Sequence, residues 1–182
     1  MCGIAGLIGL EGSETQISNI IGGMQSSLHH RGPDTKGSWT SMKDKIFFIH
    51  TRLSILDLSK RANQPMHSSC GRYTISFNGE IYNHLKLRDM LKSIKKNIQW
   101  KSSSDTETLV ECFSNLGIDK TLSLLRGMFA FALFDQKNKE IYLVRDRFGE
   151  KPLYLLNLKN GVFSFASEVS TFSFLPSFSP NL

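Results

Sequence analysis

The stretch Met128-Phe129-Ala130-Phe131-Ala132-Leu133-Phe134 is apolar at every position. An apolar run of this length without polar alternation predicts a strand that is covered on both faces. Lys137-Asn138-Lys139 then supplies a turn into residues 141–144, which have an extended pattern of their own. Together these segments predict an antiparallel hairpin inside a layered core.

Segments before and after this hairpin alternate between two patterns. Extended patterns cover residues 3–10, 46–55, 73–77, 153–158 and 162–166, and helical spacing of apolar residues covers residues 17–28, 83–94 and 104–116. Strands on both sides of helical segments, with a central strand apolar on both faces, predict an α+β fold. We expect two packed antiparallel sheets with helices outside them.

Polar residues mark the ends of several predicted elements. The strand over 73–77 is expected to run into a turn at Asn78-Gly79-Glu80, where the glycine would let main-chain amides approach a ligand. Asn83 is expected to cap the next helix. Ser104-Asp105-Thr106-Glu107 has the spacing of a capping box, so Asp105 falls in the first turn of a helix. Position alone leaves Asp105 open between a capping role and a binding role.

Composition narrows the class of protein. The chain has 182 residues, 40% hydrophobic and 21% charged, which fits one globular domain and excludes disordered and collagenous classes. Its formal charge of +6 is dispersed, so nucleic-acid binding is not expected. No apolar run approaches a membrane span and the first ten residues lack a signal-peptide pattern, so we expect a cytoplasmic protein without a membrane partner.

The three cysteines need separate explanations, because an odd count without a CxxC pair argues against a disulfide framework and a metal site. Cys112 lies on an apolar helical stripe and is expected in the core, whereas Cys70 falls in a turn. Cys2 becomes the first residue when Met1 is removed. Taken alone, Met1-Cys2-Gly3-Ile4 fits an ordinary buried strand better than a reactive site.

A terminal cysteine has chemistry that an internal one lacks. A free thiol has a pKa near ~8.5 and an α-amino group near ~7.7–8, so Cys2 would carry its own proton acceptor at neutral pH. The five histidines are scattered, and none can be assigned as its partner from spacing. With Met1 attached the nitrogen of Cys2 is an amide, so removal of Met1 is a precondition for this chemistry.

Nine short motifs follow one another along the chain. They are Met1-Cys2-Gly3-Ile4-Ala5-Gly6, His30-Arg31-Gly32-Pro33-Asp34, Arg52-Leu53-Ser54-Ile55, Asn78-Gly79-Glu80-Ile81-Tyr82-Asn83, Ser104-Asp105-Thr106-Glu107, Arg126-Gly127-Met128-Phe129-Ala130-Phe131-Ala132-Leu133-Phe134-Asp135, Arg145-Asp146-Arg147-Phe148-Gly149, Lys151-Pro152-Leu153-Tyr154 and Phe165-Ala166-Ser167-Glu168. Their order resembles the class II glutamine amidotransferases, most closely the glutaminase domain of asparagine synthetases. The resemblance implies the N-terminal nucleophile hydrolase fold, a four-layer α/β/β/α sandwich.

The resemblance also implies a catalytic centre. Cys2 would attack the side-chain carbonyl of glutamine and form a thioester, with its α-amino group transferring a proton to the departing ammonia. The Asn78 side chain and the Gly79 amide would form the oxyanion hole, two donors aimed at the oxygen that gains charge.

Substrate binding follows from the same resemblance. Arg52 would bind the α-carboxylate of glutamine, and Glu80 and Asp105 would accept its α-ammonium. The segment after Arg52 would line the same pocket, namely Leu53, Ser54, Ile55 and Leu56.

Charged residues outside this pocket are expected to support it. Arg31 would lie beside the nucleophile, where its charge could favour the thiolate, and Asp34 would brace its loop. Arg145, Asp146 and Arg147 are expected to form a buried or partly buried ion network with a structural role.

Domain organisation and partners follow from the resemblance as well. Residues 1–172 would be the glutaminase domain, and residues 173–182 would start a linker to a synthetase domain that is absent here. The partners would be L-glutamine and a synthetase domain, in the same longer chain or as a separate subunit, and a homodimer is left open. No cofactor is expected in this domain, and ATP and Mg²⁺ are expected only in the synthetase domain.

Two functions from different classes remain at this point. One is glutamine hydrolysis that supplies ammonia to an asparagine synthetase-type amidation of an ATP-activated carboxylate. The other is a catalytically silent domain that binds glutamine or a partner and regulates another protein. Turnover that depends on Cys2 separates the two.

Overall fold

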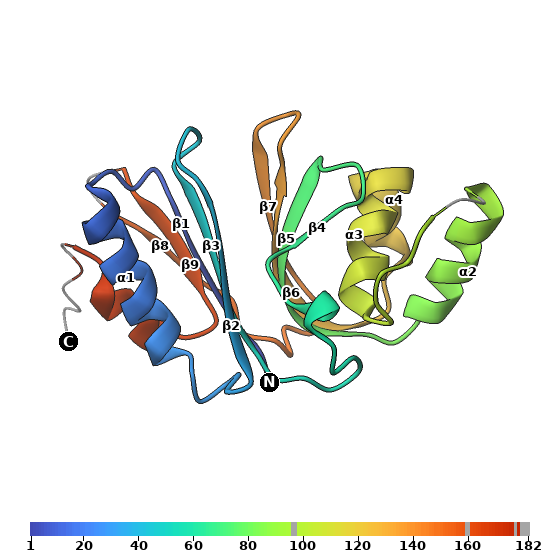
Figure 1. Cartoon of the computed structure of the whole chain (residues 1–182), viewed down its shortest axis with the longest axis horizontal. Helices are drawn as coiled ribbons and strands as arrows, with labels where there is room; N and C mark the ends of the chain where they lie inside the picture. The colour runs from blue at the N-terminus through green and yellow to red at the C-terminus, as the bar shows by residue number, and fades with distance from the viewer. Residues whose placement is uncertain (96–97, 159–160, 177, 179–182) are drawn as a thin grey trace.

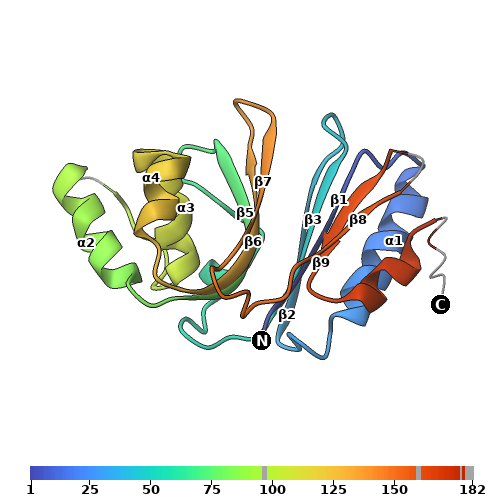
Figure 2. The ribbon, with the colours of Figure 1, turned by 180° about the vertical axis from the view of Figure 1, so that it is seen from behind.

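A computed structural model describes residues 1–95, 98–158, 161–176 and 178. Its strands form two antiparallel sheets that pack face to face, and helices cover both outer faces (Figures 1 and 2). This arrangement confirms the predicted four-layer α/β/β/α sandwich. Two residues between the strands expected over 153–158 and 162–166, and half of the linker expected over 173–182, lie outside the described residues.

The first sheet has five strands in the order β2-β3-β1-β9-β8. They are β1 (Gly3–Ile8), β2 (Thr35–Ser41), β3 (Ile46–Arg52), β8 (Tyr154–Asn157) and β9 (Phe163–Ala166). The central strand β1 pairs with β3 in a register that places Gly3 opposite Thr51. Cys2, just before β1, therefore lies beside the end of β3. A Cβ atom at Gly3 would lie only 2.6 Å from Thr51 Oγ1, so this close approach requires glycine.

The second sheet has four strands in the order β4-β5-β6-β7. They are β4 (Met66–His67), β5 (Tyr73–Ile81), β6 (Gly127–Asp135) and β7 (Glu140–Arg145). Residues 129–135 of β6 are all buried, which confirms the strand covered on both faces, and the hairpin from β6 to β7 is antiparallel as predicted. In the described part of the chain, β4 pairs with Thr74 and Ile75 alone, so the rest of that edge of β5 has no strand neighbour there.

Helices α1 (Glu14–Ser27) and η2 (Val169–Phe174) cover the first sheet. Helices α3 (Asp105–Leu116) and α4 (Ile118–Leu124) cover the second, and α2 (His84–Ile94) packs on the outer side of α3 (Figure 1). The helix expected from Ser104 is confirmed, because the Ser104 hydroxyl accepts a 3.2 Å hydrogen bond from the Glu107 amide. Helix α1 begins earlier than expected, since Ser13 and Gln16 form a capping box.

Two local expectations are wrong, and a third is confirmed only in part. Asn78-Gly79-Glu80 is part of strand β5 and not a turn, because all three residues pair with β6. Strand β3 ends at Arg52, three residues before the expected end. Asn83 is the N-cap residue of α2 as expected, but its side chain does not bond to the helix and bonds instead to Leu124 and Arg126 of the neighbouring segment.

Several elements were not predicted from the sequence, and β2 and α4 show why. Strand β2 lies at a sheet edge and consists mainly of small polar residues, so it carries no apolar alternation. Helix α4 has only seven residues, too few to show a helical period.

The predicted ion network at Arg145, Asp146 and Arg147 is also wrong. Asp146 accepts four main-chain amides, from Phe129, Phe148, Glu150 and Lys151, at 3.0–3.2 Å. Arg145 donates to the main-chain oxygens of Gly149 and Lys151, at 2.5 and 2.7 Å. These side chains therefore shape the loop between β7 and β8 through hydrogen bonds to the main chain.

The core continues past the expected domain boundary at residue 172. Leu175 is buried in the cluster between α1 and the first sheet, and Phe178 packs against this cluster. The boundary itself stays a prediction. Among the described residues, no helix is long and apolar enough to cross a membrane.

Candidate active site

A cavity of about 130 Å³ lies beside the N-terminus and is lined by residues from both sheets. Its walls include most of the predicted site residues, namely Cys2, Arg52, Leu53, Ile55, Leu56, Asn78, Gly79, Glu80 and Asp105. Segments far apart in the sequence thus meet in one place. Ser54 and Arg31 do not line the cavity.

Cys2 is held by the first residue after β3. Its sulfur accepts a 3.4 Å hydrogen bond from the Leu53 amide and lies 3.7 Å from the Leu53 oxygen. Burial raises the pKa of the Cys2 thiol, against the lowering effects of the Leu53 hydrogen bond, the terminal amine and Arg52. In the chain that still carries Met1, burial thus favours the neutral thiol, so an attack by the sulfur needs a nearby base to accept its proton.

The side chain of Asn78 reaches the same cavity from β5. The residue is 1% exposed, and its Nδ2 has no hydrogen-bond partner among the described residues. A buried amide donor without a partner is costly unless a ligand or water completes it. Asn78 thus offers an open donor to whatever occupies the cavity.

The main-chain N–H of Gly79 also faces the cavity. The alternation of N–H directions along β5 shows this. The amides of Phe77 and Ile81 donate to the side chains of Gln64 and Asp105, at 2.7 and 2.9 Å, on the edge that faces away from β6. Because N–H groups alternate between the two edges of a strand, the Gly79 amide points to this edge as well. It lies in the cavity wall between these two bonded amides.

Glycine is required at position 79 by close packing. A Cβ atom there would lie 2.3 Å from the Met128 oxygen, which is closer than real Cβ contacts. The glycine of this motif is therefore required because β5 and β6 approach each other closely, and not because the chain turns there.

Arg52, at the end of β3, is 6% exposed and is held by the loop that follows it. Its Nη1 donates to the Ser59 oxygen and to Asn63 Oδ1, at 3.0 and 2.9 Å, and its Nη2 donates to the Asp57 oxygen. A guanidinium has five N–H groups, so these three bonds leave donors for a carboxylate in the cavity.

Asp105 is the first residue of α3 and is 5% exposed. Its Oδ2 accepts the Ile81 amide at 2.9 Å, which fixes the carboxylate against β5. Burial raises the pKa of the Asp105 carboxyl, although the Ile81 hydrogen bond acts in the opposite direction. A buried carboxylate of this kind gains most from a cationic partner in the cavity.

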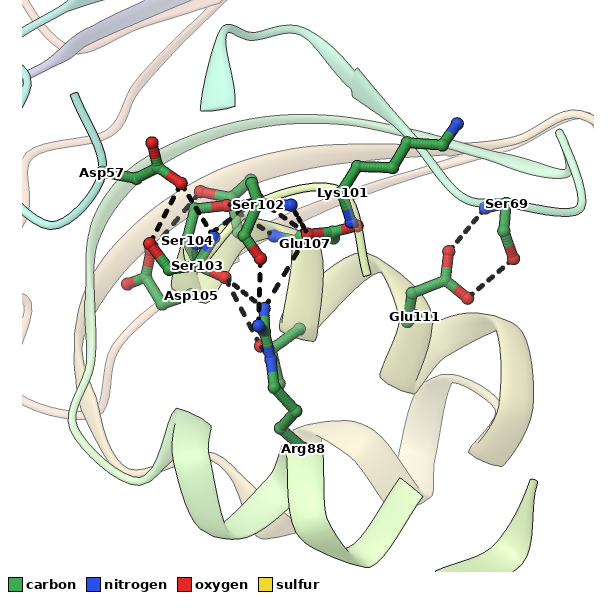
Figure 3. Close-up of polar contacts among 12 residues, drawn as sticks. Asp57, Ser69, Arg88, Lys101, Ser102, Ser103, Ser104, Asp105, Glu107 and Glu111 are labelled. Atoms are coloured by element: carbon green, nitrogen blue, oxygen red, sulfur yellow. Dashed lines mark hydrogen bonds and ion pairs between the residues drawn. The ribbon is translucent and has the colours of Figure 1, made fainter. Parts of the chain in front are cut away.

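The segment before Asp105 is fixed by a polar cluster (Figure 3). Glu107 accepts the amides of Lys101 and Ser102, each at 2.7 Å. Arg88 of α2 donates to the oxygens of Ser102 and Ser104, at 3.0 and 3.1 Å. Asp105 therefore begins its helix from a rigid base.

The side chain of Arg31 contacts Cys2 at the main-chain oxygen of Cys2. Its Nε donates to the Cys2 oxygen at 3.1 Å, and its Nη1 forms a 3.0 Å ion pair with Glu168. The guanidinium thus holds the residue that carries the sulfur, and its contact is not with the sulfur itself.

Ser54 belongs to the loop that follows β3, but it does not line the cavity. Its amide donates a 2.7 Å hydrogen bond to Asp34, so the Asp34 carboxylate bonds to the loop after β3, whereas it was expected to brace its own loop. The place of Ser54 among the expected binding residues is not supported by this geometry.

Sequence reasoning assigned no role to several residues of the cavity wall, among them Asp57, Gln64, Thr106 and Lys151. Lys151 is buried, and its Nζ lies 3.2 Å from the Met1 sulfur. It falls in a motif that matched the family without carrying a role, so the motif was the signal available. In the described part of the chain, no three His, Cys, Asp or Glu residues cluster closely enough to hold a metal ion.

Two packed antiparallel sheets with helices on both outer faces are the fold of the N-terminal nucleophile hydrolases, and here Cys2 lies before the central strand in the wall of a cavity lined by both sheets. The chain belongs to the glutamine amidotransferase domain family, whose model matches residues 1–182.

Its relatives include glutamine-hydrolysing asparagine synthetases. The chain is 37% identical to asparagine synthetase 2 of Bacillus subtilis over 94% of its own length, and 35% identical to asparagine synthetase 2 of Arabidopsis thaliana over 95%. It spans only 22% and 28% of the lengths of these two proteins.

A solved structure has the same fold. It is the glutamine phosphoribosylpyrophosphate amidotransferase of Bacillus subtilis in complex with ADP and GMP. The match has a TM-score of 0.75 and covers 95% of this chain and 43% of the other, at 21% sequence identity. At this identity the likeness concerns the fold.

Proposed function

We propose that this domain hydrolyses the side-chain amide of L-glutamine to glutamate and ammonia, with Cys2 as the nucleophile. The observation that carries the proposal is the single cavity in which Cys2, Arg52, Asn78, Gly79 and Asp105 meet. An amino acid has two charged ends, and Arg52 and Asp105 supply one opposite charge for each. Glu80, which also lines the cavity, adds a second carboxylate for the α-ammonium.

The reaction begins after Met1 is removed. The α-amine of Cys2 accepts the thiol proton, and the sulfur attacks the amide carbon of glutamine. Charge develops on the carbonyl oxygen, where Asn78 Nδ2 and the Gly79 amide would donate hydrogen bonds. This role supplies the partner that the buried Asn78 donor lacks.

The second half of the reaction restores the enzyme. The ammonium of Cys2 gives its proton to the leaving nitrogen, the carbon–nitrogen bond breaks, and ammonia departs from a thioester. Water then attacks the thioester carbon, with the same amine as the base, and the carbon–sulfur bond breaks to release glutamate. No group other than the chain, glutamine and water is consumed.

The test is glutamine-dependent ammonia release by the purified protein. We expect turnover by the wild type, none by Cys2→Ala, and unchanged turnover by Cys70→Ala, which removes an exposed thiol of a turn. A glutamine-derived diazoketone should label Cys2 alone, as mass spectrometry of peptides would show. Equal rates for wild type and Cys2→Ala contradict the proposal, as does a Met1 that stays attached.

The fate of ammonia is the second part of the proposal. The relatives named above are asparagine synthetases three to five times longer than this chain, so we propose a synthetase domain that uses ammonia to amidate an ATP-activated carboxylate. That domain, in the same chain or a separate subunit, would bind the ATP and Mg²⁺. We place the reaction in the cytoplasm, where free thiols stay reduced.

Binding without turnover is the competing outcome. A silent domain would be stabilised against heat by glutamine, with no ammonia formed even when Met1 is absent. Measuring the melting temperature and ammonia release on the same sample distinguishes the two functions.

A further inference from the structure

Asp57 lies in the loop that follows β3 and makes contacts in two directions. Its Oδ1 accepts the Ser59 amide at 2.8 Å, inside the same loop. Its Oδ2 accepts both the amide and the hydroxyl of Ser103, at 2.8 and 3.0 Å. One carboxylate therefore joins two segments that are 46 residues apart in the sequence (Figure 3).

On one side of this link lies Arg52. The main-chain oxygens of Asp57 and Ser59 both accept hydrogen bonds from its guanidinium. These two oxygens belong to the turn that the Asp57 carboxylate closes through the Ser59 amide. The orientation of Arg52 thus depends on the turn around Asp57.

On the other side of the link lies Asp105. Ser103 belongs to the segment that Glu107 and Arg88 hold in place, and Ser104 caps the helix that begins with Asp105. Hydrogen bonds from several neighbours hold this segment, so it can serve as the reference against which the Asp57 carboxylate places the loop after β3.

We propose that Asp57 is a positioning residue for the substrate: through Ser103 it fixes Arg52 relative to Asp105, and so sets the spacing between the two groups that hold the ends of glutamine. The inference rests on the proposed function, in which Arg52 binds the α-carboxylate and Asp105 the α-ammonium. Asp57 touches neither reacting atom, and it acts through Arg52 and the Ser103 segment.

The charge state of Asp57 suits this role. Hydrogen bonds from Ser59 and from the Ser103 amide hold the pKa of its carboxyl well below the ordinary value. It therefore stays ionised and accepts three hydrogen bonds across the whole working range of pH. An asparagine has one oxygen acceptor and cannot replace both carboxylate oxygens.

A second contact keeps the far end of the loop in place without Asp57. Gln64 accepts the Phe77 amide at 2.7 Å and donates to the Thr106 hydroxyl at 3.2 Å, and it is buried. We therefore expect Asp57 variants to fold, with altered spacing and an intact core.

The experiment compares glutamine with two single-ended analogues. Glutaramic acid lacks the α-ammonium, and 4-aminobutanamide lacks the α-carboxylate, so each engages only one of the two groups. In Asp57→Ala we expect KM for glutamine to rise about tenfold with kcat within about twofold, whereas kcat/KM for both analogues stays unchanged. Selectivity for glutamine over each analogue therefore falls about tenfold.

Ser103→Ala tests the link from its other end. It removes one of the two Ser103 hydrogen bonds, so we expect a smaller rise in KM, and no further change when it is added to Asp57→Ala. Asp89→Asn is the matched control, because it removes an equal charge from the exposed face of α2. It should leave every constant unchanged.

Three results would overturn the inference: an unchanged KM in Asp57→Ala, an equal loss for glutamine and both analogues, or additive effects in the double variant. If Asp57→Ala fails to fold, the selectivity of Ser103→Ala decides alone. Failure of the proposed function has a different signature, because the wild type would then release no ammonia from glutamine.

Discussion

His50 Nε2 lies 3.0 Å from the main-chain oxygen of Phe77, a hydrogen bond that joins β3 of one sheet to β5 of the other. Both residues are buried, and Phe77 directly precedes Asn78. The contact therefore fixes the spacing of the sheets beside the cavity. As the donor of this bond, the imidazole carries its proton on Nε2.

This contact predicts a loss of stability in acid. Burial lowers the pKa of His50 to about 4, so the unfolded state binds a proton below pH 6.5 that the folded state binds only near pH 4. The free energy of unfolding should fall as pH falls through this window, by about 2 kcal/mol between pH 7 and pH 5. Urea unfolding at both pH values measures the change.

His50→Gln separates this residue from other titrating groups. Glutamine keeps a donor for Phe77 and does not titrate, so the loss between the two pH values should shrink by about the same 2 kcal/mol. His29→Gln, at an exposed position, should keep the wild-type slope. An unchanged slope in His50→Gln would contradict the prediction.

Asn78→Ala should lower kcat by about 10²–10³ with little change in KM, since an oxyanion donor acts mainly in the transition state. The variant also removes a buried donor without a partner, so its stability should not fall by the amount usual for a lost hydrogen bond. Steady-state kinetics and thermal unfolding of the same preparation check both statements. A large rise in KM at constant kcat would argue for a ground-state binding role instead.

Asp105→Asn should raise KM for glutamine by at least tenfold while the fold persists, because an amide oxygen can still accept the Ile81 amide. The wild type should show a related pH effect. The pKa of Asp105 is raised, so its carboxyl gains a proton at a higher pH than an ordinary aspartate, and KM should climb as pH falls. If the KM of Asp105→Asn still rises with falling pH as in the wild type, Asp105 is not the source of this pH dependence.

Arg31→Lys should lower kcat by about ten- to a hundredfold, because a lysine cannot hold the Cys2 oxygen and Glu168 with one planar group. KM should change little, since Arg31 does not line the cavity. Glu168→Gln keeps an acceptor for Arg31 and should have the smaller effect. Equal effects on KM and kcat in Arg31→Lys would point to a general disturbance of the fold.

Gly79→Ala should destabilise the fold by about 1–3 kcal/mol, because its Cβ would meet the Met128 oxygen at 2.3 Å. Gly22→Ala is the matched control. No atom lies within 4 Å of a Cβ at Gly22 on α1, so alanine there should stabilise the helix by about 0.5–1 kcal/mol. Chemical denaturation of both variants gives the comparison, and equal stabilities would contradict it.

Sequence patterns predicted the elements whose burial leaves a clear signal. The apolar run in β6, the hairpin into β7 and the helix that begins after Ser104 were all predicted, because period and capping are local properties. Edge strand β2 was missed since it faces solvent on alternate residues and carries few apolar side chains. The turn predicted at Asn78-Gly79-Glu80 failed because the glycine serves strand packing, which depends on Met128.

The candidate site divides in the same way. Motif resemblance located Cys2, Arg52, Asn78, Gly79 and Asp105, and the cavity brings these five together. It placed Ser54 in the pocket and gave no role to Asp57, because the direction of a side chain in an irregular loop and a contact with Ser103 are both set by tertiary packing and have no local signal.

The sequence by itself determined the family, the layered α+β architecture and the residue types of the site, because these depend on hydrophobic period, capping and short motifs. The tertiary structure alone decided the environment of each group: the partly buried sulfur beside the Leu53 amide, the open donor of Asn78, and the edge of β5 that has no strand partner beyond β4 among the described residues. Hydrogen-bond partners and desolvation arise only when distant segments pack, so a linear pattern carries no record of them.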